Sequence, residues 1–108
     1  MMTVETREPI VHDLKCWPEF FAAVRDGLKQ FEVRKNDRDF RVGDTLRLWE
    51  FDPKLNIHTG MYFHRRVTYA LTGGQFGVEE GHVVLGLADG RNLSATADAA
   101  VNDGGDEQ

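Results

Sequence analysis

Lys29, Glu32 and Arg34, near the first third of the chain, have types and a spacing that could hold a polar ligand. They lie in the run GLKQFEVR, where a helix end leads into QFEVR, which alternates polar and apolar residues as a strand does. The alternation predicts that Phe31 and Val33 face the core and that Glu32 and Arg34 share the opposite face. A carboxylate between two cations can orient a ligand through charge-assisted hydrogen bonds. The alternative is a solvated strand face with an ion pair that contributes at most about 1 kcal/mol.

A second group of candidate ligand-binding residues comes earlier, at the start of an expected helix. Lys15 and Trp17 place a cation beside an aromatic face. This combination suits the stacking of a nucleobase, which contributes roughly 1–3 kcal/mol per base. The alternative is that Trp17 is a hydrophobic staple that packs on Phe21. The residue types alone favour neither interpretation.

The densest basic stretch follows the expected strand and reads RKNDRDFR. Arg34, Lys35 and Arg38 could bind phosphate groups, and Asn36 could read a base through its amide. The alternative is an ordinary polar loop in which Asn36 and Asp37 form a turn.

Metal and cofactor chemistry are not expected. The chain has a single cysteine, Cys16, and its four histidines lack the spacing of metal ligands: His12, His58, His64 and His82. His12 shares the apolar parity of its strand, so we expect it to be a core histidine with a hydrogen-bond partner.

One helix and five strands must position these residues. Pro18 and Glu19 suit the first turn of a helix expected at about 18–26. Strands are expected at 10–14, 30–34, 45–51, 61–71 and 82–87, with turn signals between them. This order predicts an α+β fold, a small closed or half-closed β-barrel of about five to six strands with one N-terminal amphipathic helix.

The chain of 108 residues has room for one domain, expected at 10–88. The formal net charge of −5 is concentrated in residues 89–108, which hold five acidic residues and one arginine. That segment is rich in Ala, Asp, Asn and Gly and has no aromatic residue, so we expect a disordered acidic tail. The domain itself is nearly neutral, which leaves a nucleic-acid partner open.

The location expected for this chain is the cytoplasm. Its first residues show no positive region followed by an apolar run, as a signal peptide would. No stretch approaches the roughly 18–20 apolar residues that span a bilayer, so no membrane partner is expected. A lone cysteine is consistent with a reducing compartment.

Several motifs in one order carry a family resemblance. The pattern Gly-x-Lys-x-x-Glu-x-Arg at 27–34, followed by Val42-Gly43-Asp44 and an apolar strand, resembles the ASCH signature of PUA-like proteins. The wider chain, over about 10–88, more closely resembles a domain-of-unknown-function family allied to ASCH. The runs that carry this second resemblance are HDLK (12–15), WP (17–18), FEVRKNDR (31–38), Phe40 and GHVVL (81–85).

The resemblance implies a cleft beside a barrel that binds RNA or a modified nucleoside, with Lys29, Glu32 and Arg34 lining it. Some ASCH members are amidohydrolases that deacetylate N4-acetylcytidine. In them a Lys acts as base on a Thr three residues later, with a Glu from further along the chain. Lys29 matches that Lys, but position 32 is Glu, which removes the hydroxyl nucleophile. Lys29 and Glu32 would then be the catalytic pair, with Glu32 activating water as a general base.

Three functions follow from these observations. The first is a binding module for RNA, a nucleotide or a modified nucleoside, using the residues named above: Lys15, Trp17, Lys29, Glu32, Arg34, Lys35, Asn36 and Arg38. The second is an amidohydrolase that acts on a modified nucleoside. The third is a regulatory domain whose surface contacts another protein. The missing Thr favours the first over the second.

Overall fold

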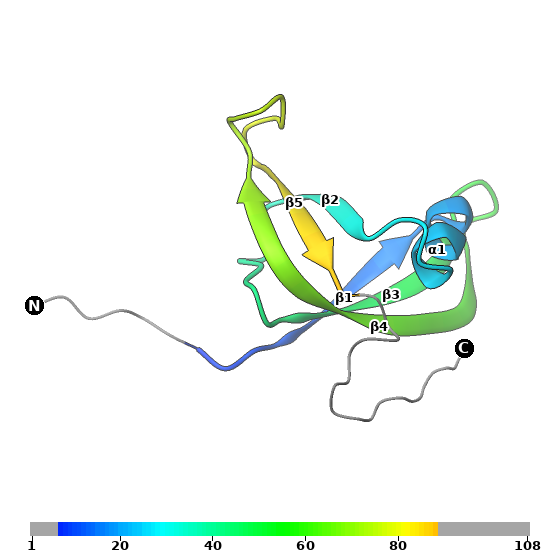
Figure 1. The fold of residues 1–108 in the computed structure, drawn as a ribbon. Coiled ribbons are helices and arrows are strands. Elements are labelled where there is room, and N and C mark those ends of the chain that lie inside the picture. The colour runs from blue at the N-terminus through cyan, green and yellow to red at the C-terminus, as the bar shows by residue number, and fades with distance from the viewer. Residues whose placement is uncertain (1–6, 89–108) are drawn as a thin grey trace, which may run out of the picture.

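The computed structural model describes residues 7–88 (Figure 1). The elements follow the predicted order of a strand, a helix and four strands. They are β1 (Val11–Cys16), α1 (Pro18–Arg25), β2 (Phe31–Lys35), β3 (Thr45–Asp52), β4 (Ile57–Thr72) and β5 (His82–Leu87). The predicted acidic tail, residues 89–108, lies outside the described residues.

All five strands belong to one sheet with the order β1-β3-β4-β5-β2. β1 pairs with β3 in parallel, and the other neighbours are antiparallel. The long strand β4 pairs with β3 over its first half and with β5 over its second half, and it curves strongly between them (Figure 1). This confirms the α+β class. In residues 7–88, however, β1 and β2 remain the two edges, so the described strands do not close into the predicted barrel.

The core lies on the concave side of the curved sheet, where α1 covers it. From α1, Phe21 and Val24 are each only 2% exposed, and the Phe21 ring packs against Phe63 at 4.7 Å between centroids. Pro18 begins the helix directly after Trp17, as predicted, and Glu19 lies in its first turn. The loop between β2 and β3 contributes Phe40, and the strands contribute the remaining members of the core cluster: Leu14, Cys16, Leu46, Leu48, Phe63, Val67, Val83, Leu85 and Leu87.

The predicted orientation of β2 is wrong. Glu32 is 3% exposed, whereas Phe31 and Val33 are 45% and 51% exposed, so the charged residues face inward and the apolar ones outward. Alternation identifies the two faces of a strand, but it does not say which face is buried. The inner face of edge strand β2 is directed toward the gap between β2 and β1. There, Lys29 and Arg34 neutralise the Glu32 carboxylate. On the outer face Val33 lies opposite Val84 of β5, a cross-strand apolar pair.

Asp44, in the turn before β3, organises the start of the domain. Its carboxylate is 1% exposed and accepts hydrogen bonds from Arg7 at 2.8 and 2.9 Å and from the backbone N–H groups of Ile10 and Arg41. It also pairs with His12 Nε2 at 2.8 Å, which confirms His12 as a partnered core histidine. Burial favours the neutral acid, but the bonds from Arg7 and His12 outweigh it and hold the pKa of Asp44 well below its usual range.

None of the helices in residues 7–88 is long and apolar enough to cross a membrane.

Candidate ligand-binding cleft between the edge strands

A cleft of about 460 Å³ opens where the end of β1 and the start of α1 approach β2. This volume lies within the range of roughly 300–1,000 Å³ that is usual for small-molecule sites. The cleft combines an apolar rim with a charged floor. Its lining residues are Lys15, Cys16, Trp17, Phe20, Lys29, Glu32, Val33 and Arg34.

The floor of the cleft is an acid held between two cations. Glu32 Oε1 accepts a hydrogen bond from Arg34 Nε at 2.9 Å and forms an ion pair with Arg34 Nη2 at 2.7 Å. Glu32 Oε2 accepts one from Lys29 Nζ at 3.0 Å, and the same ammonium also donates to the carbonyl oxygen of Phe31 at 2.8 Å. Each side chain is thereby fixed by at least two contacts, which pre-organises the floor for a ligand.

Two arginine side chains span the gap between the edge strands. Arg34 Nη2 donates to the carbonyl oxygen of Lys15 at 2.9 Å, and Arg38 Nη1 donates to that of Asp13 at 2.7 Å. Residues two apart in a strand direct their backbone groups to the same edge, so both bonds reach the edge of β1 that faces away from β3. The two arginine side chains therefore occupy backbone acceptors of β1 that a neighbouring strand would otherwise use. Because side chains bridge β1 and β2 in place of direct backbone pairing, a cleft remains between them.

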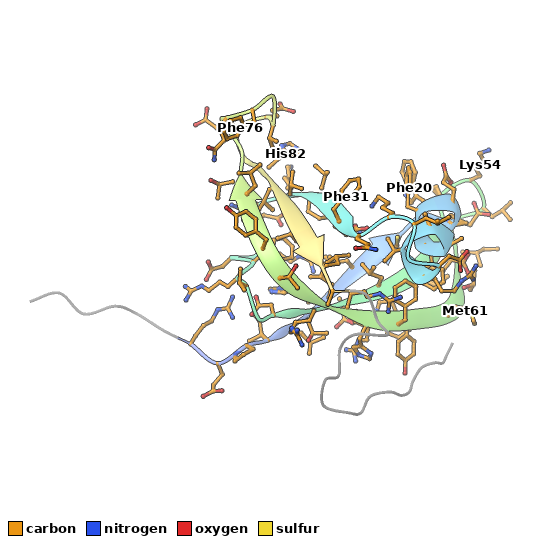
Figure 2. The ribbon with its side chains drawn as sticks, in the orientation of Figure 1. Phe20, Phe31, Lys54, Met61, Phe76 and His82 are labelled. Carbon is orange, nitrogen blue, oxygen red and sulfur yellow. The ribbon has the colours of Figure 1, made fainter. Side chains whose placement is uncertain are left out.

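The rim of the cleft is aromatic. Trp17 and Phe20, 50% and 43% exposed, stack with centroids 6.2 Å apart and ring planes 23° apart. Lys29 Nζ lies 5.6 Å from the centroid of Phe20 and 4.8 Å from that of Phe31. Figure 2 shows Phe20 on α1 and Phe31 on β2 exposed on the same side of the molecule. Trp17 therefore stacks on Phe20 and leaves much of its ring accessible, as the base-stacking alternative requires.

Phe20 lines the cleft but is not among the binding residues predicted from the sequence. The signal that could have placed it correctly is its spacing from Trp17. Residues three apart near a helix start lie on the same side, so an exposed Trp17 predicts an exposed Phe20 beside it.

The structure divides the predicted binding residues into two groups. Five of them line the cleft: Lys15, Trp17, Lys29, Glu32 and Arg34. Lys15 contributes its backbone carbonyl to Arg34, while its ammonium lies 4.5 Å from the ring centroid of Phe51.

The other three predicted residues, Lys35, Asn36 and Arg38, are exposed and do not line the cleft. Asn36 donates its backbone N–H to the carbonyl oxygen of Gly81, which fixes the loop. Arg38 reaches the backbone of β1 instead.

The lining residues offer neither a hydroxyl group nor a readily ionised thiol as a nucleophile. They include no Ser or Thr, and their one thiol, Cys16, is 3% exposed. Burial, together with the nearby Glu32 carboxylate, raises the pKa of the Cys16 thiol to about 12, so the reactive thiolate is scarce at neutral pH. Within residues 7–88, no group of three or more His, Cys, Asp or Glu side chains is placed to hold a metal ion.

Residues 11–87 match the model of a family described as a domain of unknown function, DUF3850. The chain belongs to the DUF3850 family. The matched region runs from the start of β1 to the end of β5, so the whole DUF3850 sheet, its helix and the cleft lie within it. The expected membership of a domain-of-unknown-function family is thereby confirmed.

The DUF3850 chain is also 36% identical, over 58 residues, to a protein of Escherichia phage P2 described as "Uncharacterized 12.9 kDa protein in GpA 3'region". The match takes in 54% of this chain and 51% of the phage protein, so it spans about half the length of that relative.

Proposed function

We propose that this DUF3850 chain binds RNA or a nucleotide-like ligand and that the cleft between β1 and β2 receives one base. The observation that carries the proposal is the combination of an exposed aromatic pair with a charged floor in one cavity. Trp17 and Phe20 provide the rings, and the acid–cation group around Glu32 provides the polar contacts.

The chemistry of the two parts fits the two properties of a nucleobase. The flat faces of a base stack on exposed aromatic rings, at roughly 1–3 kcal/mol per base. Its edge carries donors and acceptors that need partners once water is excluded, and a buried carboxylate with two cations supplies both kinds. A cavity of about 460 Å³ suits one unstacked base. The favoured ligands are therefore a free nucleotide or a splayed base of single-stranded RNA.

The proposal includes the relationship to ASCH proteins, a half-closed PUA-like barrel and a cytoplasmic location. The residues that carry the ASCH resemblance support it by their positions. Lys29, Glu32 and Arg34 form the floor of the cleft, and Asp44 of the Val-Gly-Asp turn anchors the start of the domain. The curvature of β4 brings β1 and β2 close enough for the Arg34 side chain to bridge them. The arrangement is that of a barrel in which the backbones of the first and last strands of the sheet do not pair.

No observation favours the amidohydrolase alternative. A lining without Ser or Thr and with a protonated Cys16 supplies neither a hydroxyl nor a thiolate nucleophile. Incubation with N4-acetylcytidine, followed by chromatography of the nucleoside, tests it. We expect no conversion to cytidine; rapid conversion that is lost in Lys29→Ala would establish the enzyme instead.

The binding proposal is tested by titrating the protein with uridine 5′-monophosphate and with a single-stranded RNA oligonucleotide at low and moderate salt. Tryptophan fluorescence of the Trp49→Phe variant, in which Trp17 is the one remaining tryptophan, reports occupancy. We expect saturable binding that weakens as salt rises, because phosphate contacts release counterions. Arg34→Gln should reduce it, whereas Arg66→Gln, an exposed cation on β4 away from the cleft, should not. Absence of saturable binding by both ligands would refute the proposal.

A further inference from the structure

Phe31 is an exposed aromatic residue beside the cleft that is not among the residues lining it. It lies on the outer face of edge strand β2 and is 45% exposed. A single exposed apolar side chain is ordinary on a protein surface. Phe31 differs because the ammonium of Lys29, a residue that does line the cleft, lies 4.8 Å from the centroid of its ring.

The Lys29 ammonium connects Phe31 to the aromatic rim of the cleft. It lies 4.8 Å from the Phe31 centroid and 5.6 Å from the Phe20 centroid, so the two centroids are at most about 10 Å apart. Phe20 in turn stacks on Trp17. Two aromatic surfaces, the Trp17–Phe20 pair at the start of α1 and Phe31 on β2, therefore adjoin one cation. Figure 2 shows Phe20 and Phe31 exposed on the same side of the molecule.

The position of this cation is fixed, and the charge around it favours an anion. Lys29 Nζ donates to the carbonyl oxygen of Phe31 at 2.8 Å and to Glu32 Oε2 at 3.0 Å. Because Glu32 also pairs with Arg34, the group holds two cations and one carboxylate and carries a formal net positive charge. Cations beside aromatic rings are what proteins use to hold the backbone of a single strand while its bases stack.

A mononucleotide has one base and would leave one of the two aromatic surfaces unused. We propose that the cleft is half of a site for two adjacent nucleotides of a single strand. One base enters the cleft, the next base stacks on Phe31, and Lys29 contacts the phosphate that joins them. Neighbouring bases of a single strand can separate to meet different rings, whereas those of a duplex stay stacked on each other. This inference rests on the proposed function of the same cleft.

The test compares two ligands that differ by one nucleoside. They are the dinucleotide uridylyl-3′,5′-uridine and the methyl ester of uridine 5′-monophosphate, and each carries one phosphodiester charge. Calorimetric titration of the wild-type protein gives both affinities. We expect the dinucleotide to bind roughly fivefold to a hundredfold more tightly, the factor that one stacked base contributes. The 2′-deoxy dinucleotide separates an RNA ligand from a DNA ligand, and an advantage of either over the ester supports the two-nucleotide site.

Two variants locate the second base. Phe31→Leu keeps an apolar side chain but removes the aromatic face, so the advantage of the dinucleotide over the ester should fall to about twofold or less. Phe76→Leu is the matched control, because Phe76 is 85% exposed on the β4–β5 turn. Figure 2 shows Phe76 well away from Phe20 and Phe31. This variant should keep the wild-type advantage.

The outcomes separate the inference from the proposed function. If the ester and the dinucleotide bind the wild type equally well, the two-nucleotide inference is overturned and the cleft remains a site for one base. An advantage that survives in Phe31→Leu but is lost in Phe76→Leu would also overturn it. If neither compound binds, the proposed function fails together with the inference. The comparison on the wild-type protein decides these points even if a variant does not fold.

Discussion

Arg34 Nη2 donates to the carbonyl oxygen of Lys15 at 2.9 Å, so a side chain from one edge strand is bonded to the backbone of the other. The same guanidinium holds Glu32 through Nε and Nη2. One residue therefore fixes the width of the gap and the position of the carboxylate within it. The shape of the cleft therefore depends on how the sheet places its two edge strands. Arg34 and Glu32 contribute both to the structure of the domain and to the proposed ligand site.

Glu32 is predicted to matter for stability as well as for binding. Glu32→Ala removes the carboxylate and leaves the side chains of Lys29 and Arg34, 20% and 23% exposed, without their shared acceptor. The expected loss is about 2–3 kcal/mol of unfolding free energy, because water reaches both cations and offsets part of the cost. Urea denaturation measures it. Glu80→Ala, in an exposed turn, should change the value by no more than about 0.5 kcal/mol. Equal curves for the wild type and Glu32→Ala would show that the ion pairs are not structural.

The outward orientation of the apolar residues on β2 predicts a difference between two phenylalanines. Phe31 is 45% exposed and Phe21 is 2% exposed. Phe21→Ala should cost about 3–5 kcal/mol, whereas Phe31→Ala should cost about 1 kcal/mol or less. Thermal or urea melts of the two variants decide this. Equal losses of unfolding free energy in the two variants would show that Phe31 packs in the core as Phe21 does.

The buried carboxylate of Asp44 predicts a pH-dependent contribution to stability. Its pKa in the folded protein lies below the ordinary value of 3.8 because Arg7 and His12 hydrogen-bond to it, despite its burial. Its contribution is therefore complete above about pH 4 and is lost as the pH falls through the lower folded-state pKa. Asp44→Asn should be about 2–4 kcal/mol less stable than the wild type at pH 7. The difference between the urea midpoints of the wild type and Asp44→Asn should decrease as the pH falls from 4 to 2. A constant difference over that range would contradict a stabilising contribution from the ionised Asp44 carboxylate.

Trp17 should contribute to binding more than to folding. Trp17→Ala should weaken the binding of uridine 5′-monophosphate by about 1–3 kcal/mol because the base loses its stacking partner. The unfolding free energy of this variant should change little because the Trp17 ring is half exposed. The control is Trp49→Phe on the outer face of β3, where Trp49 packs on Tyr62 at 4.5 Å between centroids. Calorimetric titration of both variants is the measurement. A loss of affinity in Trp49→Phe with none in Trp17→Ala would move the site to that outer face.

Local periodicity was sufficient to predict the elements of the DUF3850 chain. The helix expected at 18–26 is Pro18–Arg25, and the last strand has its expected bounds. β4 begins earlier than predicted, at Ile57, because the residues after the β3–β4 turn pair with Phe51 and Asp52. Such pairing is decided by the partner strand, which the alternation of one segment does not describe.

The candidate site was less accessible to sequence reasoning, for two physical reasons. Alternation in QFEVR separated Glu32 and Arg34 from Phe31 and Val33 correctly, but the buried face was chosen by hydrophobicity alone. A carboxylate can take the inner face when cations close to it in the chain neutralise it there. The Asp44 network joins residues more than 30 positions apart, Arg7 and His12 to Asp44, and no local pattern encodes such a contact.

The most direct test of the account is the position of the bound nucleotide. Titration of the ¹⁵N-labelled protein with uridine 5′-monophosphate, followed by amide NMR shifts, maps the site residue by residue. The account predicts the largest shifts at Lys15 to Phe20 and at Lys29 to Arg34, on the two edge strands and the start of α1. Shifts centred instead on Arg47, Trp49 and Tyr62 of the outer sheet face, or no shifts at saturating nucleotide, would contradict it.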